Sequence, residues 1–131
     1  MDQLLAKRYL LQKPFTIEDY PFGEGVAVFK VKTKMFATLS LGKMGKGKAK
    51  NSQGDGVYWM NLKCDPTHAI ELRDIFPSVI PGYHMNKVHW NTVILDGSIP
   101  QGEIERMIDH SFELVVAKMT KKDQQSIQIM L

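Results

Sequence analysis

The chain has 131 residues, of which 44% are hydrophobic and 24% are charged, a composition that fits one globular domain with one core. The single cysteine, Cys64, excludes an intramolecular disulfide and a cysteine-based metal framework, and it fits a reducing compartment. The sequence shows neither a secretory signal nor an apolar run of about 18 residues, so we predict a cytoplasmic protein without membrane segments.

The positive charge is concentrated in one segment. The net charge is +3, and residues 42–56 (GKMGKGKAKNSQGDG) carry an excess of the same size. The basic residues of this segment are Lys43, Lys46, Lys48 and Lys50, and its only acid is Asp55. Clustered positive charge makes a stronger local electrostatic potential than the same charge spread over the surface. This glycine-rich loop is therefore a candidate for anion contacts.

The first predicted element is a helix over residues 2–12. Asp2 is a suitable N-cap, and Leu4, Leu5 and Leu11 fall on a helical repeat. The segment that follows, 16–24, predicts a turn or a short strand.

Two antiparallel strands come next, over residues 26–32 and 35–41, joined by a hairpin at Thr33 and Lys34. Each strand alternates with a period of two, which predicts one buried face. The predicted buried sets are Ala27, Phe29 and Val31 in the first strand and Met35, Ala37, Leu39 and Leu41 in the second, with Phe36 on the opposite face.

A third strand is predicted over residues 57–64, so the basic loop joins two strands like a long wing. Asp65 followed by Pro66 is a strong helix start, and Pro77 ends that helix.

The last elements are a short apolar strand over residues 92–95 and a long helix that ends near Met119. Ser98 with Gln101 resembles a capping box for this helix. We therefore predict one domain over residues 1–119, followed by a C-terminal tail over residues 120–131. Strands between helices, with little room for parallel crossovers, indicate an α+β sandwich with helices on one face of an antiparallel sheet.

The stretch from Pro81 to Val93 holds the densest group of aromatic, amide and imidazole side chains. Two of the four histidines and one of the two tryptophans fall within it. It is either a functional surface or a turn whose polar groups satisfy their own backbone.

Five motifs in order resemble those of the MmcQ/YjbR-like family. They are EDYPFG at 18–23, KMFA at 34–37, NLKCDP at 61–66, PGYHMNK at 81–87 with HWNTV at 89–93, and DHS at 109–111 with ELV at 113–115. The resemblance covers about residues 1–119 and implies a frataxin-like two-layer fold. It also implies DNA binding, through likeness to a double-wing module.

The first functional hypothesis is non-enzymatic DNA binding. Lysines on a strand-connecting loop can follow phosphates without exact geometry, and Tyr83 and Trp90 could stack on bases. The candidate phosphate contacts are Lys43, Lys46, Lys48, Lys50 and Lys87. The alternative is a solvated loop that keeps the protein in solution.

The second hypothesis is a pocket for a small anion or a nucleotide, because pockets pair apolar walls with a few placed polar groups. Its candidate residues are Lys63, Tyr83, His84, Asn86, His89, Trp90 and Asn91. A third hypothesis is a protein-interaction module, in which the apolar residues from Ile127 to Leu131 pair with another chain or with the edge of the sheet.

No catalytic motif, cofactor fingerprint or metal-ligand set is found in the sequence. Cys64 lies on the inward face of its strand, which favours a core residue over a reactive thiolate. Asp109, His110 and Ser111 match a catalytic triad in composition only, because adjacent helical residues point about 100° apart. We therefore expect a monomer that is not an enzyme and holds no cofactor and no metal.

Overall fold

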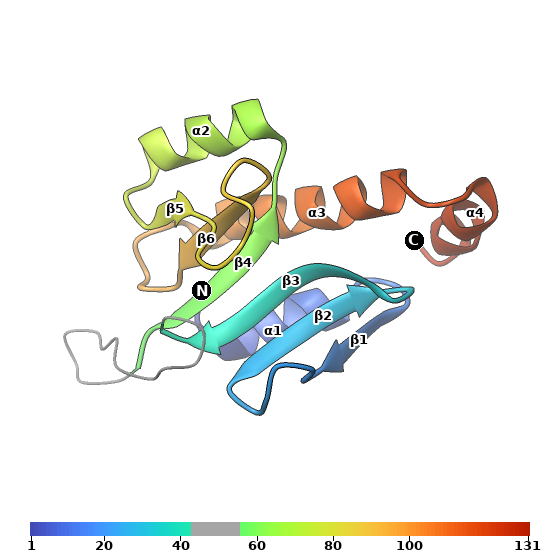
Figure 1. Ribbon diagram of the computed structural model, residues 1–131, viewed down its shortest axis with the longest axis horizontal. Coiled ribbons are helices and arrows are strands. Elements are labelled where there is room, and N and C mark those ends of the chain that lie inside the picture. Colours follow the sequence, from blue (N-terminus) through green and yellow to red (C-terminus); the bar gives the residue numbers. More distant parts are fainter. Residues whose placement is uncertain (43–55) are drawn as a thin grey trace.

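The computed structural model describes residues 1–42 and 56–131. It contains the elements α1 (Gln3–Leu11), β1 (Thr16–Asp19), β2 (Val26–Val31), β3 (Lys34–Leu41), β4 (Tyr58–Lys63), α2 (Pro66–Ile75), β5 (Val79–Pro81), β6 (Trp90–Ile94), α3 (Gln101–Ala117) and α4 (Lys121–Ile129). The strands form one antiparallel sheet in the order β1-β2-β3-β4-β6-β5 (Figure 1). The predicted α+β sandwich is confirmed.

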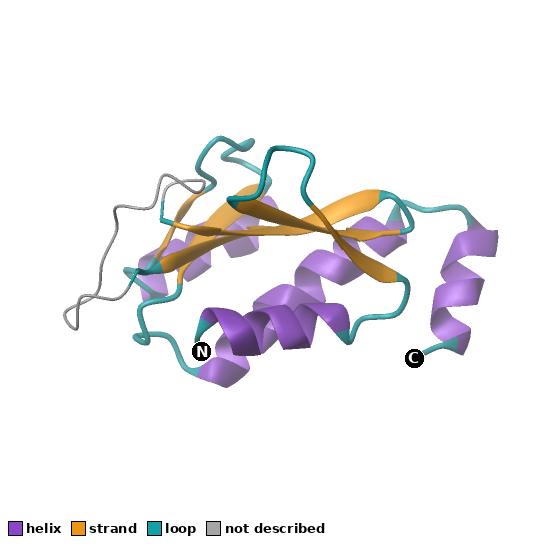
Figure 2. Cartoon of the chain, turned by 90° about the horizontal axis from the view of Figure 1, so that it is seen from below, coloured by secondary structure: helices purple, strands orange, loops and turns teal. Residues whose placement is uncertain are grey.

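Helices α1, α2 and α3 lie on one face of this sheet, α4 lies beyond its end, and loops lie over the other face (Figure 2). Helix α1 lies against β1 and β3, α3 crosses the centre, and α2 packs against β5 and β6. The core between the two layers contains the predicted inward residues Ala27, Phe29, Val31, Ala37 and Leu39. None of the described helices is long and apolar enough to cross a membrane.

Helix α1 begins as predicted but buries a different stripe. The carboxylate of Asp2 accepts a hydrogen bond from the backbone N–H of Leu5 at 2.9 Å, which confirms the N-cap. Ala6 and Leu10, one turn apart, are fully buried, whereas Leu4 is 62% exposed. Helical periodicity identifies an apolar stripe on the helix. It does not show which part of the stripe faces the sheet, and here that part is the pair Ala6 and Leu10.

The β2–β3 hairpin turns at Lys32 and Thr33, one residue earlier than predicted. Val31 pairs with Lys34, and the two residues between them have φ angles of 45° and 71°. Two left-handed residues in a two-residue loop match the twist of the strands, but this conformation is costly for a β-branched threonine.

Strand β3 contains a bulge, which makes the predicted orientation of Phe36 wrong. The register between β2 and β3 shifts between Phe29 and Lys30, so one extra residue is accommodated on β3. Phe36 and its neighbour Ala37 are consequently both in the core. The ring of Phe36 packs edge-on against Phe112 of α3, with centroids 5.3 Å apart.

The two later helices start differently. Asp65 caps α2 by accepting from the N–H of His68 at 3.2 Å, and Pro66 is the first helical residue, as predicted. The predicted capping box of α3 is wrong: Pro100 occupies the N-cap position, and no side chain caps the helix. The Ser98 hydroxyl instead bonds to the carboxylate of Asp96 at 2.6 Å.

The segment predicted as a tail contains helix α4. Thr120 caps it by accepting from the N–H of Asp123 at 3.2 Å, and Ile127 is buried in the main core. Met130 and Leu131 beyond it are exposed. The buried Ile127 and the contacts of Lys32 with Asp123 and Ser126 hold this segment against the end of the sandwich.

Candidate functional site

The connection from β5 to β6 crosses in front of β4, on the face of the sheet opposite α1 and α3 (Figure 1). Its backbone docks on two buried polar side chains at Tyr83. The N–H of Tyr83 donates to Thr92 Oγ1 at 2.8 Å, and the Tyr83 carbonyl accepts from Asn61 Nδ2 at 3.4 Å. Thr92 also donates to Asn61 Oδ1, so the loop and the sheet share one hydrogen-bonded network.

Three rings meet on this face of the sheet, opposite α1 and α3. Trp59 and Tyr83 pack edge-to-face, with centroids 5.8 Å apart, and the His84 ring lies 4.2 Å from that of Tyr83. Trp59 and Tyr83 are half-buried, and His84 is exposed with a left-handed backbone (φ 57°). We call these three residues the aromatic platform. Sequence reasoning did not select Trp59, although strand alternation places it on the same face as Asn61.

Other candidates in the stretch hold the loop together. The side-chain oxygen of Asn86 accepts from the N–H groups of Val88 and His89 at 2.9 and 3.2 Å. Lys87 Nζ donates to the carbonyl of Gly82 at 3.0 Å. The His89 side chain is exposed, while its carbonyl accepts from the N–H of Cys64 at 2.8 Å. Asn86 and Lys87 thus act within the turn.

Trp90 and Asn91 are buried, and Arg73 of α2 binds both. Its Nε donates to Asn91 Oδ1 at 2.7 Å, and its terminal nitrogen donates to the carbonyls of Lys87 and Trp90. A planar guanidinium has the donors for such a multiple contact. Arg73 was missed by sequence reasoning, because nothing local to α2 shows that the loop ends beside it.

Gly82 is required by a close approach in the same loop. A Cβ built on Gly82 would lie 2.8 Å from Trp90 Cβ and 2.9 Å from the Trp90 carbonyl oxygen. The N–H of Gly82 donates to that carbonyl at 2.9 Å, so the backbones must stay this close.

The structure places Lys63 apart from the aromatic platform. Its side chain lines a cavity of about 480 Å³ together with residues of the β2–β3 hairpin and of the α3–α4 junction. The predicted pocket that combined Lys63 with Tyr83 and His84 therefore separates into two regions.

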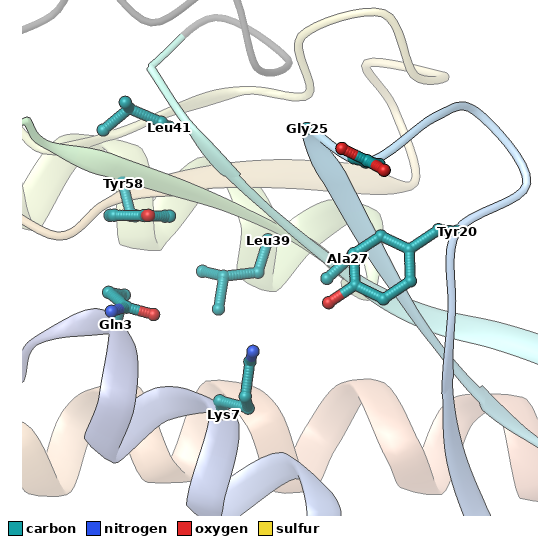
Figure 3. A pocket seen from close by; sticks show the side chains of 9 residues that line it. Gln3, Lys7, Tyr20, Gly25, Ala27, Leu39, Leu41 and Tyr58 are labelled. Atoms are coloured by element: carbon teal, nitrogen blue, oxygen red, sulfur yellow. The ribbon is translucent and has the colours of Figure 1, made fainter.

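Another cavity, of about 310 Å³, lies between α1 and the sheet (Figure 3). Gln3 and Lys7 enter it from α1, and Leu39 faces them from the sheet. Lys7 Nζ lies 3.2 Å from Glu18 Oε2, so the positive charge in this cavity is neutralised by a carboxylate.

The three residues that match a catalytic triad in composition, Asp109, His110 and Ser111, each form a hydrogen bond with a different part of the fold. Ser111 donates to the carbonyl of Phe36, His110 Nε2 accepts from the N–H of Asp65 at 3.2 Å, and Asp109 accepts from the Tyr9 hydroxyl at 2.7 Å. Cys64 is buried in the core as predicted, and burial raises the pKa of its thiol to about 11. The thiol is therefore protonated near neutral pH.

Of the lysine-rich segment, the structure describes only the two flanking glycines. Lys43, Lys46, Lys48 and Lys50 lie outside the described residues. Its described flanks are Gly42, whose N–H donates to the carbonyl of Val57 at 2.7 Å, and Gly56. Within residues 1–42 and 56–131 there is no group of three or more histidine, cysteine or acidic side chains that could hold a metal ion.

Comparison with known proteins agrees on one family. The YjbR family model matches residues 11–114. The chain is 36% identical to uncharacterized protein YbdF of Escherichia coli O157:H7, over 94% of this chain and 91% of that protein. It is 42% identical to uncharacterized protein YjbR of Escherichia coli K12, over 44% of this chain and 48% of that one.

Two solved structures share the fold. The crystal structure of Deinococcus radiodurans protein DR2400 matches with a TM-score of 0.77 and 31% identity, over 94% of this chain and 85% of that one. A crystal structure of a Pseudomonas syringae protein matches with a TM-score of 0.72 and 32% identity, over 87% and 98%. Sequence and fold together show that this chain belongs to the YjbR family.

Proposed function

We propose that this protein binds DNA without catalysing a reaction, and that it uses the face of its sheet opposite α1 and α3 to do so. The observation that carries the proposal is the aromatic platform of Trp59, Tyr83 and His84, which lies on that face. Trp59 is three residues from Gly56, where the lysine-rich segment ends. Stacking groups and phosphate-binding charge are therefore close along the chain.

This combination suits a single strand. Aromatic rings bind unstacked bases in a sequence-tolerant way, and lysines on an adjacent segment can follow the phosphates. Bases within a duplex are already stacked on one another, so a platform of this kind favours single-stranded over duplex DNA. Asn61 and Thr92 beneath the rings are engaged with the loop, which leaves the rings as the main contact surface.

The first test is a titration of labelled single-stranded and duplex DNA, followed by fluorescence anisotropy. Trp59→Ala should weaken single-strand binding about tenfold or more, because one base–ring contact contributes roughly 1–3 kcal/mol. Phe15→Ala is the matched control, since Phe15 is another partly exposed ring, at the hairpin end of the sheet. Equal losses in the two variants, or no binding by the wild type, would refute the proposal.

The second test addresses the lysine-rich segment through salt dependence. Changing Lys43, Lys46, Lys48 and Lys50 to glutamine should reduce the slope of log affinity against log salt by up to about 2.8, roughly 0.7 for each lost phosphate contact. The matched control removes the charge of four exposed cations outside that segment, namely Arg8, Arg106, Lys121 and Lys122, by changing each to glutamine. If both variants change the slope equally, binding depends on net charge and the assigned segment is wrong.

A further inference from the structure

A second cationic region lies at the hairpin end of the sandwich, at the opposite end of β3 from Gly42. The cavity of about 480 Å³ there is bounded by the β2–β3 hairpin, the end of β4 and the α3–α4 junction. Its charged lining residues are Lys32, Lys34, Lys63, Lys118 and Asp123, and Met35 is among its apolar ones. Four lysines thus share one hollow with a single carboxylate.

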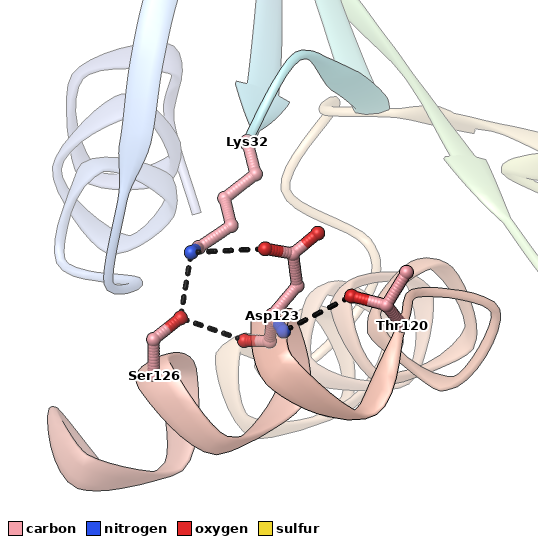
Figure 4. A network of polar contacts seen from close by, with 4 residues as sticks. All are labelled: Lys32, Thr120, Asp123 and Ser126. Atoms are coloured by element: carbon pink, nitrogen blue, oxygen red, sulfur yellow. Dashed lines mark hydrogen bonds and ion pairs between the residues drawn. The ribbon is translucent and has the colours of Figure 1, made fainter.

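The one carboxylate is already engaged. Lys32 Nζ lies 3.4 Å from Asp123 Oδ1 and 2.6 Å from the hydroxyl of Ser126 (Figure 4). Among the described residues, no acidic side chain forms an ion pair with Lys34, Lys63 or Lys118. The cavity therefore presents three positive charges that lack a counter-charge.

This arrangement of positive charges is electrostatically unfavourable. Burial and the neighbouring positive charge of Lys118 both lower the pKa of Lys63. Lys63 is half-buried, whereas Lys34 and Lys118 are exposed at the rim of the cavity. Like charges in one hollow repel one another, and an anion placed between them would reverse the sign of that interaction.

The hairpin at the rim is also held in a costly conformation. Lys32 and Thr33 are both left-handed, and the Lys32 side chain ties the turn to α4 through Asp123 and Ser126 (Figure 4). Its Nζ also lies 4.6 Å from the centre of the Phe15 ring. Strain that the surroundings maintain is characteristic of binding sites. Here it fixes the turn that immediately precedes Lys34.

We infer that this cavity binds a phosphate-bearing small molecule, with Lys34, Lys63 and Lys118 as its phosphate contacts. Three ammonium groups suit a ligand with two or more negative charges, and lysine binds phosphate as a point charge without strict geometry. The volume is within the range of small-molecule sites. Met35 and Val115 can contact the carbon part of such a ligand.

Isothermal titration calorimetry with inorganic pyrophosphate tests this site. The double variant Lys63→Gln with Lys118→Gln should lose about tenfold or more in affinity, because it removes two charged hydrogen-bond donors. The matched control, Lys121→Gln with Lys122→Gln, removes the same charge from exposed positions of α4 that do not line the cavity. It should change affinity by less than about twofold, as for screened surface charges.

Three outcomes would overturn the inference: no pyrophosphate binding by the wild type, equal losses in the two double variants, or equal losses of pyrophosphate and single-stranded DNA binding in the cavity variant. The last outcome would make these lysines part of a nucleic-acid path. Unchanged DNA binding, with pyrophosphate affinity lost and a melting temperature no lower than that of the wild type, supports a separate small-molecule site. Failure at this site leaves the aromatic platform untested, since none of its residues is changed.

Discussion

The loop from Gly82 to His89 and the lysine cavity at the hairpin end differ in how far apart their residues are in the sequence. The loop residues are contiguous, and their polar groups mostly bond to one another, to the sheet or to Arg73. The cavity lysines come from separate elements and find too few partners. The dense polar stretch in the sequence therefore indicated a loop held by its own hydrogen bonds. The cluster of unpaired lysines, in contrast, forms only when separate elements come together in the fold.

The same comparison has an energetic side. In the loop, donors and acceptors are satisfied, so removing one leaves a buried group without a partner. In the cavity, like charges and left-handed residues are held together, so removing one relieves a cost. Substitutions in the two regions should change the free energy of unfolding in opposite directions.

The largest expected effect is that of Arg73→Ala. It would leave Asn91 Oδ1 and the carbonyls of Lys87 and Trp90 without this donor, and should lower the free energy of unfolding by about 3 kcal/mol. Urea denaturation measures the change. Arg106→Ala is the control, because Arg106 is exposed and its ion pair with Glu103 contributes about 0.5 kcal/mol or less. Equal losses would show that Arg73 does not hold the loop.

Gly82→Ala is expected to cost less, about 2 kcal/mol, because its Cβ would overlap Trp90 unless the loop shifts. Gly102 in the first turn of α3 has nothing within 4 Å of an added Cβ, so Gly102→Ala should stabilise by up to about 1 kcal/mol. The pair can be compared by thermal melting. A neutral result at Gly82 would mean that the loop can shift away from Trp90 at little cost.

In the cavity, Thr33→Gly should stabilise the protein by about 0.5–1 kcal/mol. Glycine removes the left-handed penalty of a β-branched residue, and the gain exceeds its cost in backbone entropy. Thr67→Gly serves as the counterpart, since Thr67 is an exposed residue in α2 and glycine there should destabilise by a similar amount. Destabilisation by both changes would contradict a strained hairpin.

The smallest expected effect is the contribution of Lys63 to the pH dependence of the free energy of unfolding. Because its pKa is lowered in the folded state, the unfolded chain binds more protons between that pKa and 10.5, and this residue makes stability rise with pH in that window. Cys64 and Tyr9 have raised pKa values and act in the opposite direction over similar pH values. Subtracting the curve of Lys63→Gln from that of the wild type isolates the contribution, which should not exceed about 0.5 kcal/mol. A difference that falls with rising pH would contradict it.

Most of the fold follows from local rules. Asp65 with Pro66 marks the start of α2, and alternation in β2 and β4 selects the inward residues, because each signal depends on neighbours in the chain. The bulge at Phe36 does not follow, since one extra residue is decided by pairing with β2. Strand β5, at three residues, is too short to show any period.

The candidate surfaces were less predictable than the fold. Tyr83 and His84 were selected, but their partner Trp59 depends on the loop crossing β4. Lys63 was selected for an anion, yet its neighbours Lys34 and Lys118 are 29 and 55 residues away along the chain. Sequence spacing carries no information about contacts of that kind.

The two borders of the sheet have a consequence for how molecules of this protein meet one another. Strand β1 has four residues and carries Glu18 and Asp19, and β5 has three residues and ends in Pro81, which lacks an N–H group. Short, charged or proline-containing edges offer few free donors and acceptors to a strand of another molecule. Growth of the sheet from one copy into the next, the first step toward fibrous aggregates, is thereby disfavoured at both borders.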